Sequence, residues 1–392
     1  MEIGNILKNC RSDLNWTQEQ VAKALKVQRE LVAMWETGSR TPGLKALEKL
    51  AMLYRVDLDY LLGKTNVKTL NSHRELLYRG IKSDEPQVHI EIENWLKFLD
   101  NWAQIVIDND NYKKPRFPKA LDKGPNFVDS RHIPTLVTEV RDNLQLGHFD
   151  ISCLEAVLDE LKIIVYKSFF NNESSSIFGA FYEHPKLGYS IFINAQTSPG
   201  RQAFTLAHEM CHALYHYGTV TGSVNRKGNN SKEEFFANKF AAHFLVPSRE
   251  LKEFIESNGW ENNLDPDKVI ILSYLFNVSF QLMLIRLEQE AFIKNESRQE
   301  WEKLQPNSMA KSLNLPSDLW QIPKITDMGL NKYPSSVLKK TKELIESDII
   351  TESQAANLLD VDLMTVRLDL MAQPQTSEVE HANEFEDLTC AR

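Results

Sequence analysis

The stretch Phe204-Thr-Leu-Ala-His-Glu-Met-Cys-His212 contains the pattern His-Glu-x-x-His near the middle of a chain of 392 residues. A Ser-Pro pair before it and a glycine after it predict one helix over residues 198–217. On such a helix, His208 and His212 lie one turn apart on one face, where both can bind one zinc ion. Glu209 is then placed to take a proton from an attacking water molecule.

A zinc peptidase needs a third protein ligand, and this helix does not supply it. His216 continues the row of histidines, but it lies about 12 Å from His208 along the helix axis. One ion at about 2 Å from each nitrogen cannot span that distance and also bind His212. The longer pattern His-Glu-x-x-His-x-x-Gly-x-x-His is absent, because Tyr215 and Gly218 occupy its last two fixed positions. The third ligand is therefore expected from another element.

The next predicted helix, from Ser231 to Pro247, is the expected source of that ligand. It begins with a capping box in which Ser231 is followed three residues later by Glu234. Glu233 and Glu234 are both candidates, and periodicity alone does not separate them. Asn238 lies one turn beyond Glu234, where it is either a hydrogen-bond partner of that carboxylate or a surface residue.

The residues around these two helices form a longer pattern. Its parts are Val140-Arg141-x-x-Leu144-x-Leu146-Gly147, Arg201-x-x-Phe204-Thr205-x-Ala207-His208-Glu209-x-x-His212 and Glu234-x-x-Ala237-Asn238-x-Phe240-Ala241-Ala242-x-x-Leu245-x-Pro247. This pattern resembles the ImmA/IrrE family of zinc metallopeptidases over residues 133–295. The resemblance implies a zincin-like domain with a small sheet plus helices, and zinc as the cofactor. It also implies His208, His212 and Glu234 as the ligands and Glu209 as the catalytic base.

Other residues near the motif have weaker assignments. Cys211 is expected to be a small buried residue, and His243 to face the core or solvent. Residues 188–194 are expected to form an edge strand that could hold a substrate peptide by strand addition. The candidates for the donor that stabilises a tetrahedral oxyanion are Tyr215, His216 and Tyr217.

The first 65 residues predict a compact, all-helical domain. Apolar spacing and cap signals place its helices at residues 14–25, 28–36, 44–54 and 56–62. Two short helices joined by a tight turn form a helix-turn-helix. The pattern Thr17-Gln18-Glu19…Ala22…Leu25…Val27…Trp35-Glu36-x-Gly38-x-Arg40-x-Pro42, with Leu47…Leu50-Ala51 and Asp59-Tyr-Leu-Leu-Gly63, resembles the Xre or lambda-repressor-like family.

This second resemblance implies that residues 28–34 lie in the major groove of a double-stranded DNA operator and that Gln18 contacts a phosphate. Arg29 is the best base reader, because its planar guanidinium matches guanine O6 and N7. Gln28 and Glu30 are weaker candidates, and the family usually has Ser or Thr at the position of Gln28. A homodimer on a two-fold operator is expected, because one helix reads few base pairs. The alternative is that the helix pair makes only protein contacts.

The composition is ordinary for a globular protein, with 42% apolar and 25% charged residues. The net charge of −9 is uneven: residues 1–70 carry 11 Lys and Arg against 8 Asp and Glu, and the remainder carries 34 against 46. A basic head on an acidic body favours nucleic acid at one end only. Four cysteines without paired spacing favour the cytoplasm. Neither a signal peptide nor an apolar run of about 18 residues is present, so no membrane association is expected.

The expected fold is mainly α, of the α+β class, with strands near residues 162–166, 177–182 and 189–194. A helix over residues 90–107 serves either as a dimerisation or spacer helix or as packing for the next domain. Another helix-turn-helix pattern, near residues 350–368, is too acidic for DNA and favours protein contacts. The expected segments are a DNA-binding domain (1–65), a helical connector (66–130), the peptidase domain (131–300), a helical region (301–372) and an acidic disordered tail (373–392).

The sequence predicts a DNA-binding regulator with zinc endopeptidase activity. The resemblance implies that it cleaves a specific protein, a repressor or antitoxin-like partner, and so controls a mobile element, a toxin or a defence system. The alternatives are a transcription factor whose peptidase-like domain only senses zinc or a partner, and an antitoxin that neutralises a toxin by binding it. A domain kept only for binding has no need of Glu209.

Overall fold

The computed structural model describes residues 3–65, 86–109, 112–115, 117, 121, 129–146, 154–169, 177–216, 224–226, 232–316, 318–325 and 327–372. The chain divides into two compact units, residues 1–336 and residues 337–392. The described part is mainly helical with one small sheet, which confirms the predicted fold class. The predicted features at Tyr217, Gly218 and Ser231 and the acidic tail lie outside the described residues.

Five helices form the N-terminal bundle: α1 (Ile3–Asp13), α2 (Gln18–Leu25), α3 (Arg29–Thr37), α4 (Leu44–Tyr54) and α5 (Leu58–Leu61). The predicted capping box at the start of α2 is confirmed, with Thr17 Oγ1 accepting from the Gln20 amide and Gln20 Oε1 accepting from the Thr17 amide. Gly38 ends α3 in the left-handed region with φ of 76°. Buried apolar residues from all five helices make one core, including Leu7, Val21, Val32, Leu53 and Leu61.

A buried ion pair joins α1 to α3. The guanidinium of Arg11 donates from Nε to Glu36 Oε1 at 2.6 Å and from a terminal nitrogen to Oε2 at 2.9 Å. The Glu36 side chain is only 3% exposed, and Gln18 Nε2 also donates to it at 2.9 Å. Burial raises the pKa of Glu36, but the bonds from Arg11 and Gln18 outweigh this and bring its pKa below the ordinary value.

Four strands form the sheet, in the order β1 (Ile164–Ser168), β3 (Gly188–Asn194), β2 (Ile177–His184) and β4 (Val224–Arg226). Strands β2 and β3 form an antiparallel hairpin, whereas β1 runs parallel to β3 and β4 antiparallel to β2. The prediction that residues 188–194 form an edge strand is therefore wrong. Strand β3 is paired on both sides, so its backbone cannot accept a substrate strand, and β1 and β4 are the edges.

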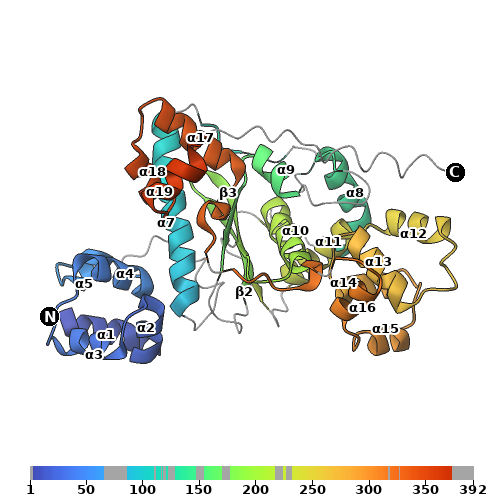
Figure 1. Ribbon diagram of the computed structural model, residues 1–392, viewed down its shortest axis with the longest axis horizontal. Helices are drawn as coiled ribbons and strands as arrows, with labels where there is room; N and C mark the ends of the chain where they lie inside the picture. Colours follow the sequence, from blue (N-terminus) through green and yellow to red (C-terminus); the bar gives the residue numbers. More distant parts are fainter. Residues whose placement is uncertain are drawn as a thin grey trace. The chain divides into compact units, whose positions relative to one another are not determined.

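The long helix α7 (Pro86–Asn109) packs on one face of the sheet (Figure 1). Trp95 Nε1 donates to Ser190 Oγ at 2.9 Å, and the indole packs against Tyr182 and Phe192. The apolar stripe of the predicted 90–107 helix is buried, as its interpretation as packing for the next domain requires, whereas Ile107 near its end is exposed. The buried residues of the stripe are Ile92, Trp95, Leu96, Leu99, Trp102 and Val106. The first turns of α7 also contact the N-terminal bundle, where the His89 ring packs on Trp16.

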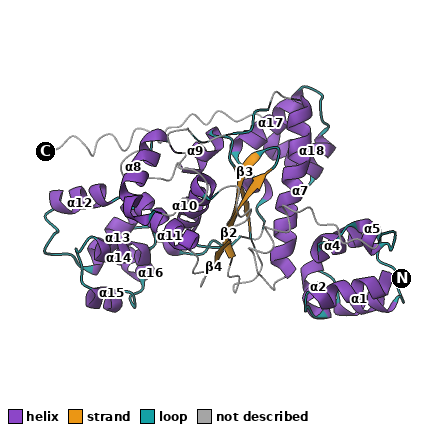
Figure 2. Ribbon diagram, turned by 180° about the vertical axis from the view of Figure 1, so that it is seen from behind, coloured by secondary structure: helices purple, strands orange, loops and turns teal. Residues whose placement is uncertain are grey.

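The other face of the sheet is covered by α10 (Pro199–Tyr215), as the opposite view in Figure 2 also shows. Helix α10 packs in turn against α11 (Lys232–Leu245), and α11 against α8 (Ile133–Asn143). The remaining elements of this unit are η2 (Ser130–His132), α9 (Leu154–Glu160), α12 (Ser248–Ser257), α13 (Pro266–Leu275), α14 (Phe280–Gln289), α15 (Asn295–Trp301), α16 (Pro306–Ser312), η3 (Asp318–Trp320) and η4 (Gly329–Lys332).

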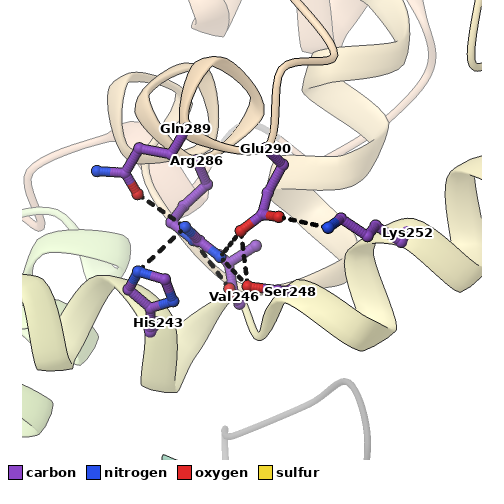
Figure 3. A network of polar contacts seen from close by, with 7 residues as sticks. All are labelled: His243, Val246, Ser248, Lys252, Arg286, Gln289 and Glu290. Carbon is purple, nitrogen blue, oxygen red and sulfur yellow. Dashed lines mark hydrogen bonds and ion pairs between the residues drawn. The ribbon is translucent and has the colours of Figure 1, made fainter. Parts of the chain in front are cut away.

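A buried arginine on α14 fixes the end of α11, as Figure 3 shows. Arg286 is 0% exposed and donates to the Val246 carbonyl, to Ser248 Oγ and to Glu290 Oε1. The guanidinium also contacts His243, and Glu290 in turn binds Lys252 at 2.9 Å. Every side of this buried charge is therefore satisfied, which a stable buried cation requires.

The second unit contains α17 (Ser335–Glu346) from Val337 onward, α18 (Glu352–Leu358), α19 (Leu363–Thr365) and a π-helical turn, η5 (Val366–Leu370). Thr351 and Gln354 form a capping box like the one in α2. No single helix among the described residues is long and apolar enough to cross a membrane. Helices α13 and α14 reach that length and composition only as a pair, with a bend of 105° between them.

We predict that Glu36→Ala strongly destabilises the N-terminal bundle, because it leaves the guanidinium of Arg11 buried without its carboxylate. The expected loss is on the order of 3 kcal/mol. Hydrogen exchange of the α1 and α3 amides measures it as a large loss of protection. The pKa of Glu36 is lowered, so its stabilisation is complete at neutral pH and disappears as pH falls through the lowered value.

The matched control is Asp59→Ala, which removes an exposed ion pair with Lys64 in the same domain. It should change protection little, since exposed pairs contribute at most about 1 kcal/mol. Equal effects of the two substitutions would show that the Arg11–Glu36 pair does not hold α1 to α3.

Candidate metal centre

Helix α10 presents two histidines from its buried face. His208 is 0% exposed and His212 is 2% exposed, and their Nε2 atoms lie 3.0 Å apart. This spacing follows from the four-residue repeat, which places the two side chains one above the other. Both imidazoles therefore point their Nε2 atoms at one place.

Glu234 comes to the same place from α11. Its Oε2 lies 3.3 Å from His208 Nε2, and its Oε1 lies 3.5 Å from His212 Nε2. A tetrahedral zinc ion with bonds of about 2.0–2.1 Å holds its ligand atoms about 3.3 Å from one another. The three observed separations agree with that value, so these residues fit a zinc ion with little movement.

Burial and mutual contacts set the pKa values of this cluster so that its groups can bind a metal ion. Desolvation lowers the pKa of His212 to about 4, so its imidazole is neutral at pH 7 and its lone pair is available. Burial raises the pKa of Glu234, but its contacts with His208 and His212 outweigh this and lower the pKa to about 2. Two imidazoles and one carboxylate form a ligand set that catalytic zinc sites use, with a fourth position left for water or substrate.

Glu209 is buried at 0% exposure beside this cluster, and a glycine on β2 makes room for it. A Cβ atom at Gly179 would collide with the Thr205 side chain and would lie 3.3 Å from Glu209 Cγ and 2.9 Å from the Phe192 carbonyl oxygen. Only a residue without a side chain lets β2 pass so close to α10. This role of Gly179 could not be predicted from the sequence, because an isolated glycine in a strand is a weak signal.

His216 lies behind His212, and its Nδ1 is 2.8 Å from Nδ1 of His212. It is not part of the three-residue metal cluster, which agrees with the expectation from distance. A metal at Nε2 of His212 leaves the proton on its Nδ1, and His216 Nδ1 is then the acceptor that fixes the ring. The spacing of four residues between His212 and His216 was the available sequence signal for this contact.

The structure shows which of the two candidate glutamates of α11 lies beside the histidines. Glu234 is 5% exposed and reaches the histidines, whereas Glu233 is half-buried and lies outside the cluster. The expectation that Asn238 is a hydrogen-bond partner of Glu234 has to be corrected. Asn238 is exposed, and within the described part of the chain it forms no hydrogen bond with that carboxylate. Helical geometry explains this, because Asn238 falls on the solvent side of α11.

The structure also gives the surroundings of three other residues considered near the motif, Cys211, Tyr215 and His243. Cys211 is fully buried, and burial raises the pKa of its thiol, so it is a core residue. Tyr215 is buried between Phe236 and Phe240, away from solvent. His243 is 7% exposed and belongs to the network around Arg286 rather than to the metal cluster.

The predicted DNA-contacting residues lie on the surface of the N-terminal bundle. Gln28, Arg29 and Glu30 are all exposed at the start of α3, where Gln28 is the N-cap residue without a capping hydrogen bond. Gln18 is half-buried at the start of α2, and one N–H of its amide is used by Glu36. The first turn of α3 is therefore free to enter a groove, while Gln18 is held in a fixed orientation.

Comparison with known proteins agrees with both parts of the chain. The helix-turn-helix family model matches residues 7–61, and the model of the IrrE N-terminal-like domain, a peptidase family, matches residues 158–288. The HTH-type transcriptional regulator ImmR of Bacillus subtilis (strain 168) is 31% identical over 129 residues, which is 33% of this chain and 95% of that protein. This chain belongs to the HTH-type transcriptional regulators. It is such a regulator fused to an ImmA/IrrE-type metallopeptidase domain.

Other relatives match shorter parts of this regulator. The uncharacterized, SPbeta prophage-derived HTH-type regulator YonR of Bacillus subtilis (strain 168) is 33% identical over 89 residues, 21% of this chain and 82% of that protein. The HTH-type transcriptional activator BcrR of Enterococcus faecalis is 34% identical over 70 residues, 18% of this chain and 34% of that protein. A Mycobacterium tuberculosis transcriptional regulator of known structure, 16% identical, aligns with a TM-score of 0.27 over 48% of this chain and 51% of that one.

We predict that the regulator binds one zinc ion per chain and that Glu234→Ala removes most of it, because two imidazoles alone hold zinc weakly. Glu233→Ala, the matched control on the same helix, should retain the metal. His216→Ala should also retain it, with an affinity lower by about 10–100-fold. Elemental analysis and chelator competition measure these effects. Loss of zinc from Glu233→Ala instead of Glu234→Ala would show that the ligand is the neighbouring residue.

Proposed function

We propose that this regulator is a zinc endopeptidase that cleaves a specific protein partner, a repressor or antitoxin-like protein, and thereby controls transcription of a mobile element, a toxin or a defence system. The observation that supports this proposal most directly is the agreement of three ligand separations with a tetrahedral zinc site. A buried Glu209 on the same helix adds the group that catalysis needs and metal storage does not.

The proposed mechanism assigns a separate task to each residue. Zinc, when bound, supplies a Lewis acid for the scissile carbonyl. Glu209 takes the proton of the attacking water and passes it to the leaving amine. His208, His212 and Glu234 hold the metal, and His216 keeps the ring of His212 in orientation. The packing of α10 between sheet and α11 excludes bulk water from this cluster, which strengthens each of these interactions.

The proposed partner of the N-terminal bundle is a double-stranded operator, bound by a homodimer. The exposed start of α3 would lie in the major groove, with Arg29 as the reader of a guanine. The hydrogen bond from Gln18 to Glu36 would place the second N–H of that amide at a phosphate. Binding to an operator would bring the peptidase domain to the promoter that it regulates.

For the operator, we predict that Arg29→Ala costs on the order of 1–3 kcal/mol of binding free energy and relaxes the preference at one base pair. Gln18→Ala should weaken binding to all sequences alike, because phosphate contacts carry no base information. Selection from randomised DNA followed by titration at several salt concentrations measures both effects. The complete absence of salt-dependent DNA binding would contradict the DNA-binding assignment.

For the peptidase, we predict that Glu209→Gln retains the fold, the zinc and operator binding but loses cleavage. The amide cannot accept the proton, so the cleavage rate should fall by about 10²–10⁴-fold or more. The measurement compares protein fragments and promoter activity in cells that express each variant at equal levels. Substrate should accumulate uncleaved and co-purify with the variant.

Glu233→Gln is the matched control, because it makes the same chemical change on α11 outside the metal cluster. It should cleave and regulate as wild type does. If Glu209→Gln also regulates as wild type does, the domain senses or binds a partner without cleaving it, as the sensor and antitoxin alternatives require.

A further inference from the structure

Arg201, in the first turn of α10, is a half-buried cation without a carboxylate partner. Among the residues that the structure describes, its guanidinium forms neither an ion pair nor a hydrogen bond, and its one close contact is the ring of Phe178 at 4.7 Å. Burial lowers the pKa of this guanidinium, and no charge from the described part of the chain opposes that effect. Partial removal of a charge from water without a partner costs free energy, so an anion from outside the chain would be a favourable partner for it.

The other buried arginines of the same unit show what a structural role requires. Arg286 is surrounded by acceptors from three elements (Figure 3). Arg141 on α8 is 4% exposed, and it donates to the carbonyl of Phe244 at 2.7 Å while packing on the ring of that residue. Each of these guanidinium groups is therefore satisfied by the chain itself. Arg201 has an aromatic face to lie on, but its guanidinium has no hydrogen-bond acceptor among the described residues.

The position of Arg201 relates it to the metal cluster. His208 follows it by seven residues and His212 by eleven, so on a helix of 3.6 residues per turn all three lie on one face within about 40°. Arg201 is two turns, or about 10 Å, from His208 along the axis. Its neighbour Phe178 precedes Gly179, the residue that lets β2 pass against Thr205 and Glu209. The cation therefore lies at one end of the same α10–β2 contact that contains the candidate catalytic glutamate.

We propose that Arg201 is a specificity-determining residue that binds an acidic side chain, Asp or Glu, of the polypeptide substrate. This inference rests on the proposed peptidase function. An extended substrate rises about 3.3 Å per residue, so the acidic side chain lies three or four residues from the bond that is cleaved. The planar guanidinium accepts a carboxylate through two parallel hydrogen bonds, and the ring of Phe178 holds it in place for that contact.

A stability comparison of the full chain separates this role from a structural one. Arg201→Met keeps the apolar stem and removes a charge that has no partner, so the melting temperature should stay the same or rise. Arg141→Met is the matched control, and it should lower the melting temperature, because it removes the donor to the Phe244 carbonyl. A loss for Arg201→Met as large as that for Arg141→Met would overturn the proposal.

Peptide capture tests the specificity itself. The zinc-loaded Glu209→Gln chain is incubated with randomised twelve-residue peptides (about 40 Å extended) with acetylated and amidated ends, and the retained peptides are sequenced. Asp and Glu should be enriched at one position. Arg201→Met in the same background should abolish the enrichment, Arg201→Lys should retain part of it, and Arg201→Glu should replace it with Lys and Arg at that position. A parallel pool with free carboxyl ends distinguishes a side-chain carboxylate from a chain terminus, and retention that depends on the free end overturns the assignment.

The remaining outcomes are distinct. Retention of peptides without acidic enrichment, or enrichment that survives Arg201→Met, overturns the role of Arg201 and leaves the proposed peptidase function intact. Retention of no peptide by any variant, together with unaltered promoter control by Glu209→Gln, overturns the peptidase function and with it this inference.

Discussion

The contact between α10 and α11 is the constraint on which the metal cluster depends. One helix supplies two imidazoles through its own repeat, but the carboxylate comes from a helix that follows after a long connection. Only tertiary packing brings Glu234 within 3.5 Å of both rings. The core residues that α8, α11 and α14 share, and the Arg286 network at the end of α11, fix that packing. The free energy for placing the ligands therefore comes from apolar burial remote from the ligands themselves.

The two parts of the regulator differ in where their functional candidates lie, on the surface in one and in the interior in the other. The N-terminal bundle exposes the residues proposed to contact DNA, and a buried pair, Arg11 and Glu36, holds α1 to α3, the helix that carries them. The peptidase domain instead buries its reactive groups, so that burial keeps His212 neutral and the histidines keep Glu234 ionised. Helix α7 contacts both parts, because its first turns pack on Trp16 and its middle packs on the sheet.

The sequence was most informative where chemistry follows from spacing along one helix. The capping box at Thr17, the stop at Gly38 and the pair His208 and His212 are local features, and all lie where their patterns place them. Features that depend on contacts between distant segments were harder to predict from the sequence. Strand order depends on pairing between distant segments, so β3 was wrongly expected at an edge. Periodicity left Glu233 and Glu234 equal, and the family pattern favoured the residue that the packing of α11 brings to the histidines.

Gly179 shows how far the spatial requirements of the proposed active site extend beyond the residues assigned to its chemistry. It has no group that can bind, donate or accept through a side chain, yet the smallest side chain at this position would press on Thr205 and Glu209 together. Substitution at this position is therefore restricted by lack of space rather than by chemistry. In a survey of natural variation, a position of this kind would be recorded as intolerant without any visible function. The range of side chains accepted at this position would therefore report how closely β2 and α10 approach each other.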